Sequence, residues 1–209
     1  MDPIKEDQNE HSVATPNGSQ SMIDKRQQIL QATADMIAEY GLQACPMSKI
    51  SARAGCGAGT IYRYFETKEE LVKALFEDLI ERLTEACLHQ YDASQPLRER
   101  FYRLWGNYYH YVLANPGQRA LMEQLLASPV ICNDQRDCAL STLHLTTHQL
   151  LDDGKHQGVF KDLSNEILNT ITYGSLIMMT KKLHQSPEKF GSDVSVDAVL
   201  GMCWDAIRC

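Results

Sequence analysis

Residues 55–65 read GCGAGTIYRYF and are followed at 68–71 by KEEL, and no other part of the chain says more about its fold. The glycines at its start favour a sharp turn, and the residues after them have the spacing of a short helix. Residues 47–54, MSKISARA, form a second short helical run directly before the turn. Two brief helices around a glycine turn are the pattern of a helix-turn-helix, whose second helix enters the major groove of DNA.

One face of this second helix carries the chemistry. At about 100° per residue, Ile61 and Phe65 form an inward apolar pair and Arg63 falls on the opposite side. The Arg63 guanidinium can donate to two acceptors of guanine, and the hydroxyl groups beside it can donate to phosphate oxygens. Lys68 opens the next helix, whose first-turn N–H groups favour an anion. The residues that we expect to contact DNA are Ser48, Lys49, Gly59, Thr60, Tyr62, Arg63, Tyr64 and Lys68.

The sequence ISARAG at 50–55, with GTIYRYF at 59–65 and KEEL at 68–71, resembles the tetracycline-repressor (TetR/AcrR) family of transcriptional regulators. The resemblance extends over residues 24–76. It implies that the second helix is the recognition helix, and that the positions of Thr60, Tyr62, Tyr64 and Lys68 contact mainly the DNA backbone. An N-terminal three-helix DNA-binding domain and a larger C-terminal helical domain for ligand binding and dimerisation are therefore expected.

Three positions depart from the family pattern. Pro46 stands where the family usually has a threonine or serine that caps the helix, Cys56 replaces a usual valine, and Gly57 replaces a usual serine. Glycine is tolerated as an N-cap, so the recognition helix is still expected. The alternative for the whole motif is structural: its aromatic side chains pack a small core and its basic side chains are solvated.

The charge of the chain is unevenly distributed. The 209 residues carry a formal net charge of −7, but residues 21–76 are net positive while the segments on both sides are net negative. The acidic segments outside residues 21–76 are expected to suppress nonspecific binding to DNA. Because the net positive charge of residues 21–76 is small, specific binding is expected to depend on dimerisation and on salt concentration.

Seven cysteines at irregular positions, without a secretory signal pattern, favour a reducing compartment, and no stretch is apolar enough to span a membrane. We therefore expect a cytoplasmic protein. Residues 1–21 have the composition of a disordered acidic leader with no role in DNA binding. The expected domains are this leader, a helix-turn-helix domain at 22–67 and a helical domain at 68–209.

Apolar residues recur at helical spacing almost throughout, which predicts an all-α fold. A first helix with Tyr40 on its inner face ends at Gly41, and a long helix runs from Lys68 to about Tyr91. Gly154 and Gly158 are expected to end a later helix. The further helices are expected at 97–114, 118–127, 134–153, 164–184 and 195–208.

The last two helices, within 164–208, are expected to form a homodimer interface, as in the family. The apolar stripes suggested for this purpose are Ile167, Ile171, Gly174, Ser175, Met178 and Lys182 on the first helix, and Val196, Val199, Leu200, Cys203 and Ile207 on the second. An intramolecular core is the alternative for both stripes. A two-fold dimer is expected to bind a roughly palindromic operator.

Aromatic and methionine side chains of the C-terminal domain suit a small, largely apolar or aromatic effector. The predicted ligand-binding residues are Trp105, Tyr108, Tyr109, Met122, Phe160 and Met178, with Tyr111 and Met179 as further candidates and Glu123 as a possible mark of cation preference. The same side chains can equally be plain core. The function expected is a repressor that the effector releases from its operator.

Other classes of function have weaker support. His144 and His148 lie one helical turn apart, but no third ligand is evident, so no metal and no cofactor are expected. A thiol-based redox sensor of the same fold, using Cys56, Cys132 or Cys138, is one alternative. A small helical enzyme is another, although no phosphate loop, serine elbow or paired-carboxylate signature is present.

Overall fold

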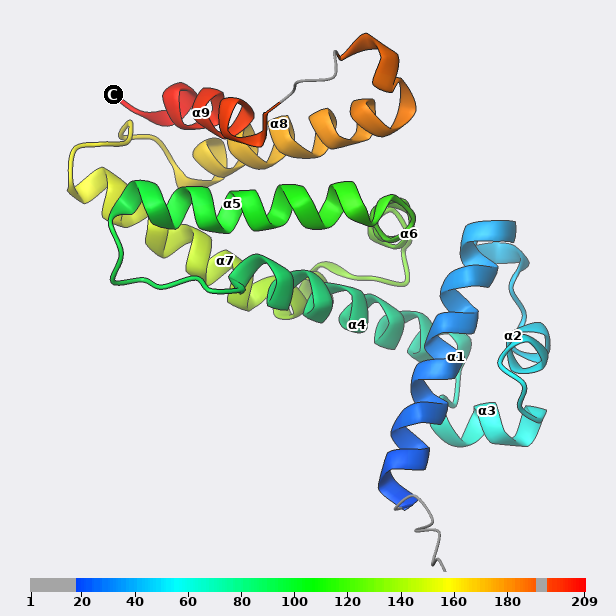
Figure 1. Ribbon diagram of the computed structural model, residues 1–209. Coiled ribbons are helices and arrows are strands. Elements are labelled where there is room, and N and C mark those ends of the chain that lie inside the picture. Colours follow the sequence, from blue (N-terminus) through cyan, green and yellow to red (C-terminus); the bar gives the residue numbers. More distant parts are fainter. Residues whose placement is uncertain (1–17, 191–194) are drawn as a thin grey trace, which may run out of the picture.

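The computed structural model describes residues 18–190 and 195–209, and over these residues the all-α prediction is confirmed (Figure 1). The one pairing of extended backbone there is an isolated bridge between Phe160 and Arg208. No helix in this part of the chain is long and apolar enough to span a lipid bilayer. The helices are α1 Gly18–Tyr40, α2 Met47–Arg53, α3 Ala58–Tyr64, α4 Lys68–Leu88, α5 Leu97–Ala114, α6 Pro116–Leu126, α7 Asn133–His156, α8 Asn165–Gln185 and α9 Val196–Ile207, with short 3₁₀ turns at Leu42–Ala44 and Pro187–Lys189.

The helix boundaries differ from the sequence-based expectation at a few points. Helix α1 already includes 18–21, which were assigned to the leader, and residues 1–17 of that leader lie outside the described residues. Gly154 lies inside α7 and does not end it; Gly158, with φ of 68°, follows the helix instead. A β-carbon at Gly154 would come within 2.0 Å of the Phe160 ring, so this glycine makes room for a packed aromatic side chain.

Helix α4 joins the two parts of the molecule, and its start is fixed locally. The Thr67 hydroxyl accepts a hydrogen bond from the Glu70 N–H at 3.0 Å, and the Glu70 carboxylate accepts one from the Glu66 N–H at 2.8 Å. These two contacts satisfy backbone donors that a helix start leaves unpaired. Over its 21 residues α4 runs for roughly 32 Å and ends three residues before the expected Tyr91.

Helices α1, α2 and α3 form a small head beside the N-terminal half of α4 (Figure 1). Their shared apolar cluster, which we call the head core, includes Ile29, Ile50, Ile61 and Phe65. Tyr40 was expected on the inner face of α1, but this last residue of the helix is 55 % exposed and is not part of the head core. The head core fixes which face of α3 is turned to solvent.

The remaining helices form a larger bundle with its own apolar cluster, the bundle core, built from the C-terminal half of α4 with α5, α7, α8 and α9. Helix α6 lies between the two cores. Its Leu121 and Leu125 are buried in the head core, while Met122 packs against both cores. The two parts of the molecule therefore share α4 and α6.

Candidate nucleic-acid interface and ligand cavity

The outward face of α3 carries the residues expected to contact DNA. Ile61 and Phe65 are buried, which confirms the predicted inward pair, and Gly59 and Arg63 are exposed on the other side. Tyr62 is 51 % exposed. The turn before α3 depends on Gly55, whose φ of 60° lies in the left-handed region that favours glycine. The result is a short helix that presents a guanidinium and a phenol to solvent.

The other residues predicted to contact DNA differ in their exposure and in their contacts with the rest of the protein. Ser48 and Lys49 are exposed on α2. Thr60 is half-buried at the start of α3. Tyr64 is also half-buried and packs against the head core, so part of its role is structural. The ammonium group of Lys68 donates to the Leu42 carbonyl at 2.7 Å, which ties α4 to the turn after α1.

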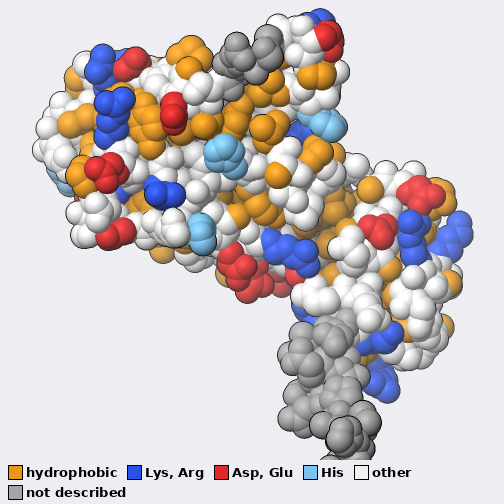
Figure 2. Space-filling view, in the orientation of Figure 1, with side chains coloured by type: hydrophobic (Ala, Val, Ile, Leu, Met, Phe, Trp, Pro, Cys, Tyr) orange, Lys and Arg blue, Asp and Glu red, His pale blue; other side chains and the backbone are white. Residues whose placement is uncertain are grey.

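Basic side chains gather on the head (Figure 2). Arg53 is paired with Glu39; hydrogen bonds from Tyr40 and from Arg53 lower the pKa of the Glu39 carboxyl, and the pairing raises the pKa of the Arg53 guanidinium. Within the described residues, Arg63 and Lys49 make no ion pair, so their charges stay available for a polyanion. Arg26 lies over the Phe65 ring, with its central guanidinium carbon 5.6 Å from the ring centre. The head therefore combines exposed unpaired cations with exposed hydroxyl groups.

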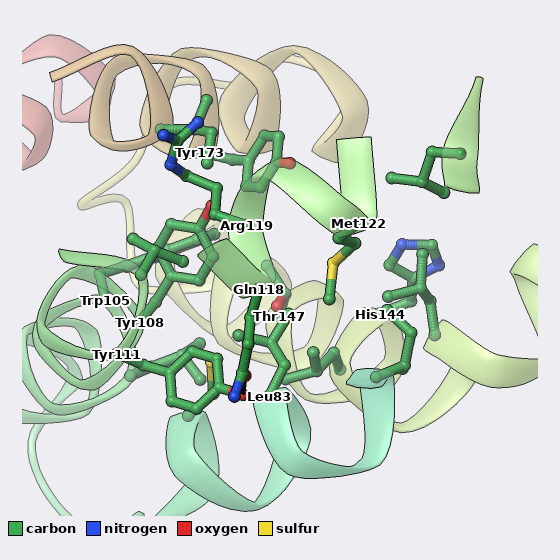
Figure 3. Close-up of a pocket in the computed structure, with 18 of the residues that line it drawn as sticks. Leu83, Trp105, Tyr108, Tyr111, Gln118, Arg119, Met122, His144, Thr147 and Tyr173 are labelled. Atoms are coloured by element: carbon green, nitrogen blue, oxygen red, sulfur yellow. Dashed lines mark hydrogen bonds between the residues drawn. The ribbon is translucent and has the colours of Figure 1, made fainter. Parts of the chain in front are cut away.

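A cavity of about 290 Å³ opens in the bundle, between α4, α5, α6, α7 and α8. Figure 3 shows Tyr108 and Tyr111 of α5 on one side, with Met122 of α6 and His144 of α7 on the other. Its lining is Ile80, Leu83, Cys87, Leu104, Trp105, Tyr108, Tyr111, Val112, Asn115, Gln118, Arg119, Met122, Glu123, Leu126, Arg136, Leu140, Leu143, His144, Thr147, Asn169, Tyr173 and Ile177.

Several polar groups in the lining are paired within the protein. The Tyr111 hydroxyl donates to the Gln118 side-chain oxygen at 2.6 Å. Glu123, which was considered a cation-preference residue, accepts from Arg119 at 2.7 Å and from Lys181 of α8 at 3.0 Å. Its charge is therefore neutralised inside the protein, and we do not assign it a preference for cationic ligands.

Three of the predicted ligand residues line the cavity and three do not. Trp105, Tyr108 and Met122 belong to the lining. Tyr109 is buried in the bundle core instead, since the next residue on a helix points about 100° away from Tyr108.

Phe160 is also in the bundle core, and its ring centre lies 5.1 Å from that of Trp204. Met178 is 50 % exposed, because it follows Ile177, which lines the cavity. Of the further candidates, Tyr111 lines the cavity, whereas Met179 packs against the bundle core.

Several lining residues were not predicted. Arg136 lies one turn before Leu140 on α7, in phase with Leu143 and Thr147, and extending that apolar stripe by one turn identifies it. Tyr173 belongs to the series 169, 173 and 177 on α8, and its ring centre is 5.5 Å from that of Tyr108. Burial raises the pKa of both tyrosines, so both phenols are neutral at physiological pH.

Helix α8 has a second, outward face. Ile167, Ile171 and Met178 are large apolar side chains left exposed on it, with Gly174 between them. The stripe suggested for α9 is wrong as an outer surface: Val199, Leu200, Cys203 and Ile207 are buried in the bundle core and Val196 packs against it. The exposed face of α9 carries other residues, among them Met202. Apolar spacing alone could not tell an inner from an outer stripe.

The histidine pair and the cysteines show no assembled site. The His144 and His148 rings are stacked with centres 6.3 Å apart, and His148 faces Glu166 at 3.6 Å. Within the described residues no three potential ligands come together to hold a metal. All seven cysteines are unpaired; Cys132 and Cys138 are exposed, and burial raises the pKa of Cys87 to about 12.

Comparison with known proteins identifies both parts of the chain. Residues 29–75 match the model of "Bacterial regulatory proteins, tetR family", and residues 96–208 match "Tetracyclin repressor-like, C-terminal domain". An uncharacterized HTH-type transcriptional regulator of Haemophilus influenzae is 24 % identical over 192 residues, which is 90 % of this chain and 98 % of that protein.

Solved structures give the same assignment. A putative TetR-family transcriptional regulator from Vibrio parahaemolyticus has a TM-score of 0.75 and 32 % identity, covering 89 % of this chain and 99 % of its own. The transcriptional regulator FadR from Bacillus subtilis, solved in complex with stearoyl-CoA, shares the fold with a TM-score of 0.71 at 19 % identity, covering 87 % and 98 %. These relatives are regulators of transcription and not enzymes, and this chain belongs to the tetR family of DNA-binding bacterial transcriptional regulators.

Proposed function

We propose that this chain is a homodimeric cytoplasmic repressor that binds a roughly palindromic operator and is released by a small, largely apolar molecule in the bundle cavity. The observation that carries the proposal is the placement of α6. One face of this helix is buried in the head core through Leu121 and Leu125, and Met122 and Leu126 of the same helix line the cavity. A molecule that displaces Met122 therefore acts on an element packed against the DNA-binding head.

Helix α4 gives a second connection. Leu71 to Ile80 supply the head core, while Ile80, Leu83 and Cys87 line the cavity. Packed helices move as rigid units, so a shift of α4 at the cavity is transmitted to the head. An effector that favours the released spacing of the heads tenfold at each site contributes about 1.4 kcal/mol per site.

The α8 face supports a dimer. Large apolar side chains in a line on one helix are costly to leave in water, and Gly174 allows a second helix to approach closely. Two heads related by a two-fold axis would reach successive major grooves about 34 Å apart, or a multiple of that spacing. FadR in complex with stearoyl-CoA supports the view that this fold can hold an effector.

The DNA contact is tested by two substitutions with different expected outcomes. Arg63→Ala removes an exposed guanidinium from α3 and should relax base preference at one or two operator positions, by about 1–3 kcal/mol each. Lys68→Ala should weaken binding to all sequences nearly equally and lower the salt slope by about one. Because Lys68 also donates to Leu42, the free energy of unfolding of this variant is measured in parallel.

The measurement is fluorescence anisotropy on DNA from upstream of the chain's own gene, with single-base variants and a salt series. Lys189→Ala, an exposed cation far along the chain from the head, is the matched control and should bind like the unchanged protein. An unchanged base preference for Arg63→Ala would contradict the recognition role. Absence of any salt-sensitive complex with upstream DNA would argue against the repressor proposal.

The cavity is tested separately. Trp105→Ala removes a large side chain from the lining and should weaken effector binding while leaving operator affinity without effector nearly intact. Mass spectrometry of small molecules that co-purify with the protein supplies the effector. Release of this variant from the operator at the same effector concentration as the unchanged protein would place the effector elsewhere.

A further inference from the structure

The cavity contains one cationic side chain whose charge the protein leaves uncompensated. Of its two lining arginines, Arg119 is paired with Glu123, and the same carboxylate is also held by Lys181. Arg136 has no carboxylate within ion-pair distance among the described residues. Its Nη2 donates to the Leu126 carbonyl at 2.9 Å, and its Nε–H is buried without any acceptor.

A second unpaired group in the lining is also a donor. Trp105 is only 5 % exposed, and its indole Nε1–H is buried without a partner. Among the lining residues described, the two buried side-chain groups that lack a partner are these N–H groups, and no lining acceptor is left in the same state. Buried donors without acceptors are costly, so the cavity is suited to a molecule that brings oxygen acceptors.

The size and the walls of the cavity limit the rest of that molecule. At about 290 Å³ it has roughly twice the volume of an engineered cavity of about 150 Å³ that holds benzene, which corresponds to about twelve non-hydrogen atoms. Leu83, Leu104, Val112, Leu143 and Ile177 give it apolar walls. An occupant therefore needs an apolar body of modest length and a compact polar end.

We propose that the cavity binds a small apolar monocarboxylate, with its acid group paired to the guanidinium of Arg136. This inference rests on the proposed function, because it names the chemical class of the effector. A carboxylate in an apolar cavity requires a cation and hydrogen-bond donors, and the planar guanidinium supplies both. Pairing at Arg136 also acts on the end of α6, because the same guanidinium holds the Leu126 carbonyl.

The test uses three probes that share one alkyl chain and differ in the polar end: decanoate, 1-decanol and decylamine. Binding to the full chain is measured by isothermal titration calorimetry at probe concentrations below micelle formation. Decanoate should bind at least about tenfold more tightly than decanol, and decylamine should bind most weakly.

Arg136→Met keeps an unbranched side chain but removes the charge, and should lower decanoate affinity about tenfold while changing decanol affinity less than about twofold. The control Arg103→Met changes an exposed arginine of α5 outside the cavity and should leave all three probes unaffected. If circular dichroism shows that Arg136→Met is unfolded, Arg136→Lys replaces it and should retain part of the preference for the acid.

Equal affinity for decanoate and decanol, tightest binding of decylamine, or no binding of any probe would overturn the inference. So would an equal loss of decanol and decanoate binding in the folded Arg136 variant. Operator binding by the probe-free protein is measured alongside. If DNA is bound and decanol or decylamine releases it, the repressor proposal stands and only the carboxylate assignment fails; if no operator complex forms, the proposed function itself fails.

Discussion

Replacing Gly174 with leucine is the sharpest test of the dimer. Gly174 lies on the outward face of α8, in line with the exposed Ile167, Ile171 and Met178. Apart from its chain neighbours and the adjacent backbone of α8, a β-carbon placed there meets no atom of the same subunit within 4 Å. Leucine also forms helices better than glycine, so the subunit itself should keep its fold and its thermal stability. Any effect on assembly therefore arises at the contact with a second copy.

The expected change in the free energy of dimer association follows from the two-fold symmetry of the dimer. A side chain forced into a close helix contact costs about 1–3 kcal/mol. In a two-fold dimer each substitution occurs twice, so the free energy of association should become less favourable by about 2–6 kcal/mol. Each 1.4 kcal/mol is a factor of ten, which raises the dimer dissociation constant from about 30-fold to about 10⁴-fold.

Sedimentation velocity over a dilution series measures this change. Gly117→Leu is the matched control, because Gly117 is also helical and an added β-carbon there likewise meets nothing within 4 Å, but Gly117 lies on α6 and not on the α8 face. The control should sediment like the unchanged protein at every concentration. A folded Gly174→Leu variant that remains dimeric to the same dilution as the control would refute the α8 interface.

Three further predictions concern the bundle. Gly154→Ala should lower the free energy of unfolding by about 1–2 kcal/mol in a urea titration, because overpacking against Phe160 at 2.0 Å outweighs the helix-propensity gain; a more stable variant would contradict this packing. The Arg100 guanidinium, whose Nη1 lies 2.7 Å from Oδ2 of Asp153, holds the pKa of the Asp153 carboxyl below its usual value. This ion pair stabilises the fold above about pH 4, and the stabilisation is lost as the carboxyl is protonated at lower pH. Asp153→Asn should therefore lower the free energy of unfolding by about 1–3 kcal/mol at neutral pH and make stability less dependent on pH in the acid range. An unchanged pH dependence in that range would argue against a stabilising role of this ion pair. Cys87, with its pKa raised to about 12, should resist iodoacetamide at about pH 8 in the native protein while the exposed thiols of Cys132 and Cys138 react. Mass spectrometry of digests measures the labelling, and rapid labelling of Cys87 would mean that the cavity is open to solvent.

Residue spacing was enough to locate the helices and the turn motif, and the residues of that motif were enough to indicate the family. Helix formation depends on contacts between residues three or four apart, so the apolar spacing located α5 at 97–114 and most other helices within three residues of the structure. Ile61 and Phe65 were oriented correctly for the same reason, because a short helix next to a glycine turn has only one apolar side to bury.

Which face of each long helix meets the core, the cavity or the solvent depends on how the helices pack against one another. Tyr108 and Tyr109 are adjacent and chemically alike, yet only Tyr108 lines the cavity, and the same holds for Ile177 and Met178. The apolar stripe of α9 was predicted to lie in the dimer interface, but it is buried in the bundle core.

Contacts between residues far apart in the chain make these choices. The Lys68 ammonium meets the Leu42 carbonyl across 26 positions, and Lys181 reaches Glu123 across 58. Glu123, which lines the same cavity as Arg136, is held by Arg119 of α6 and by Lys181 of α8. Such pairings depend on how whole helices pack, and helical periodicity, which is local, carries no information about which helix will lie opposite.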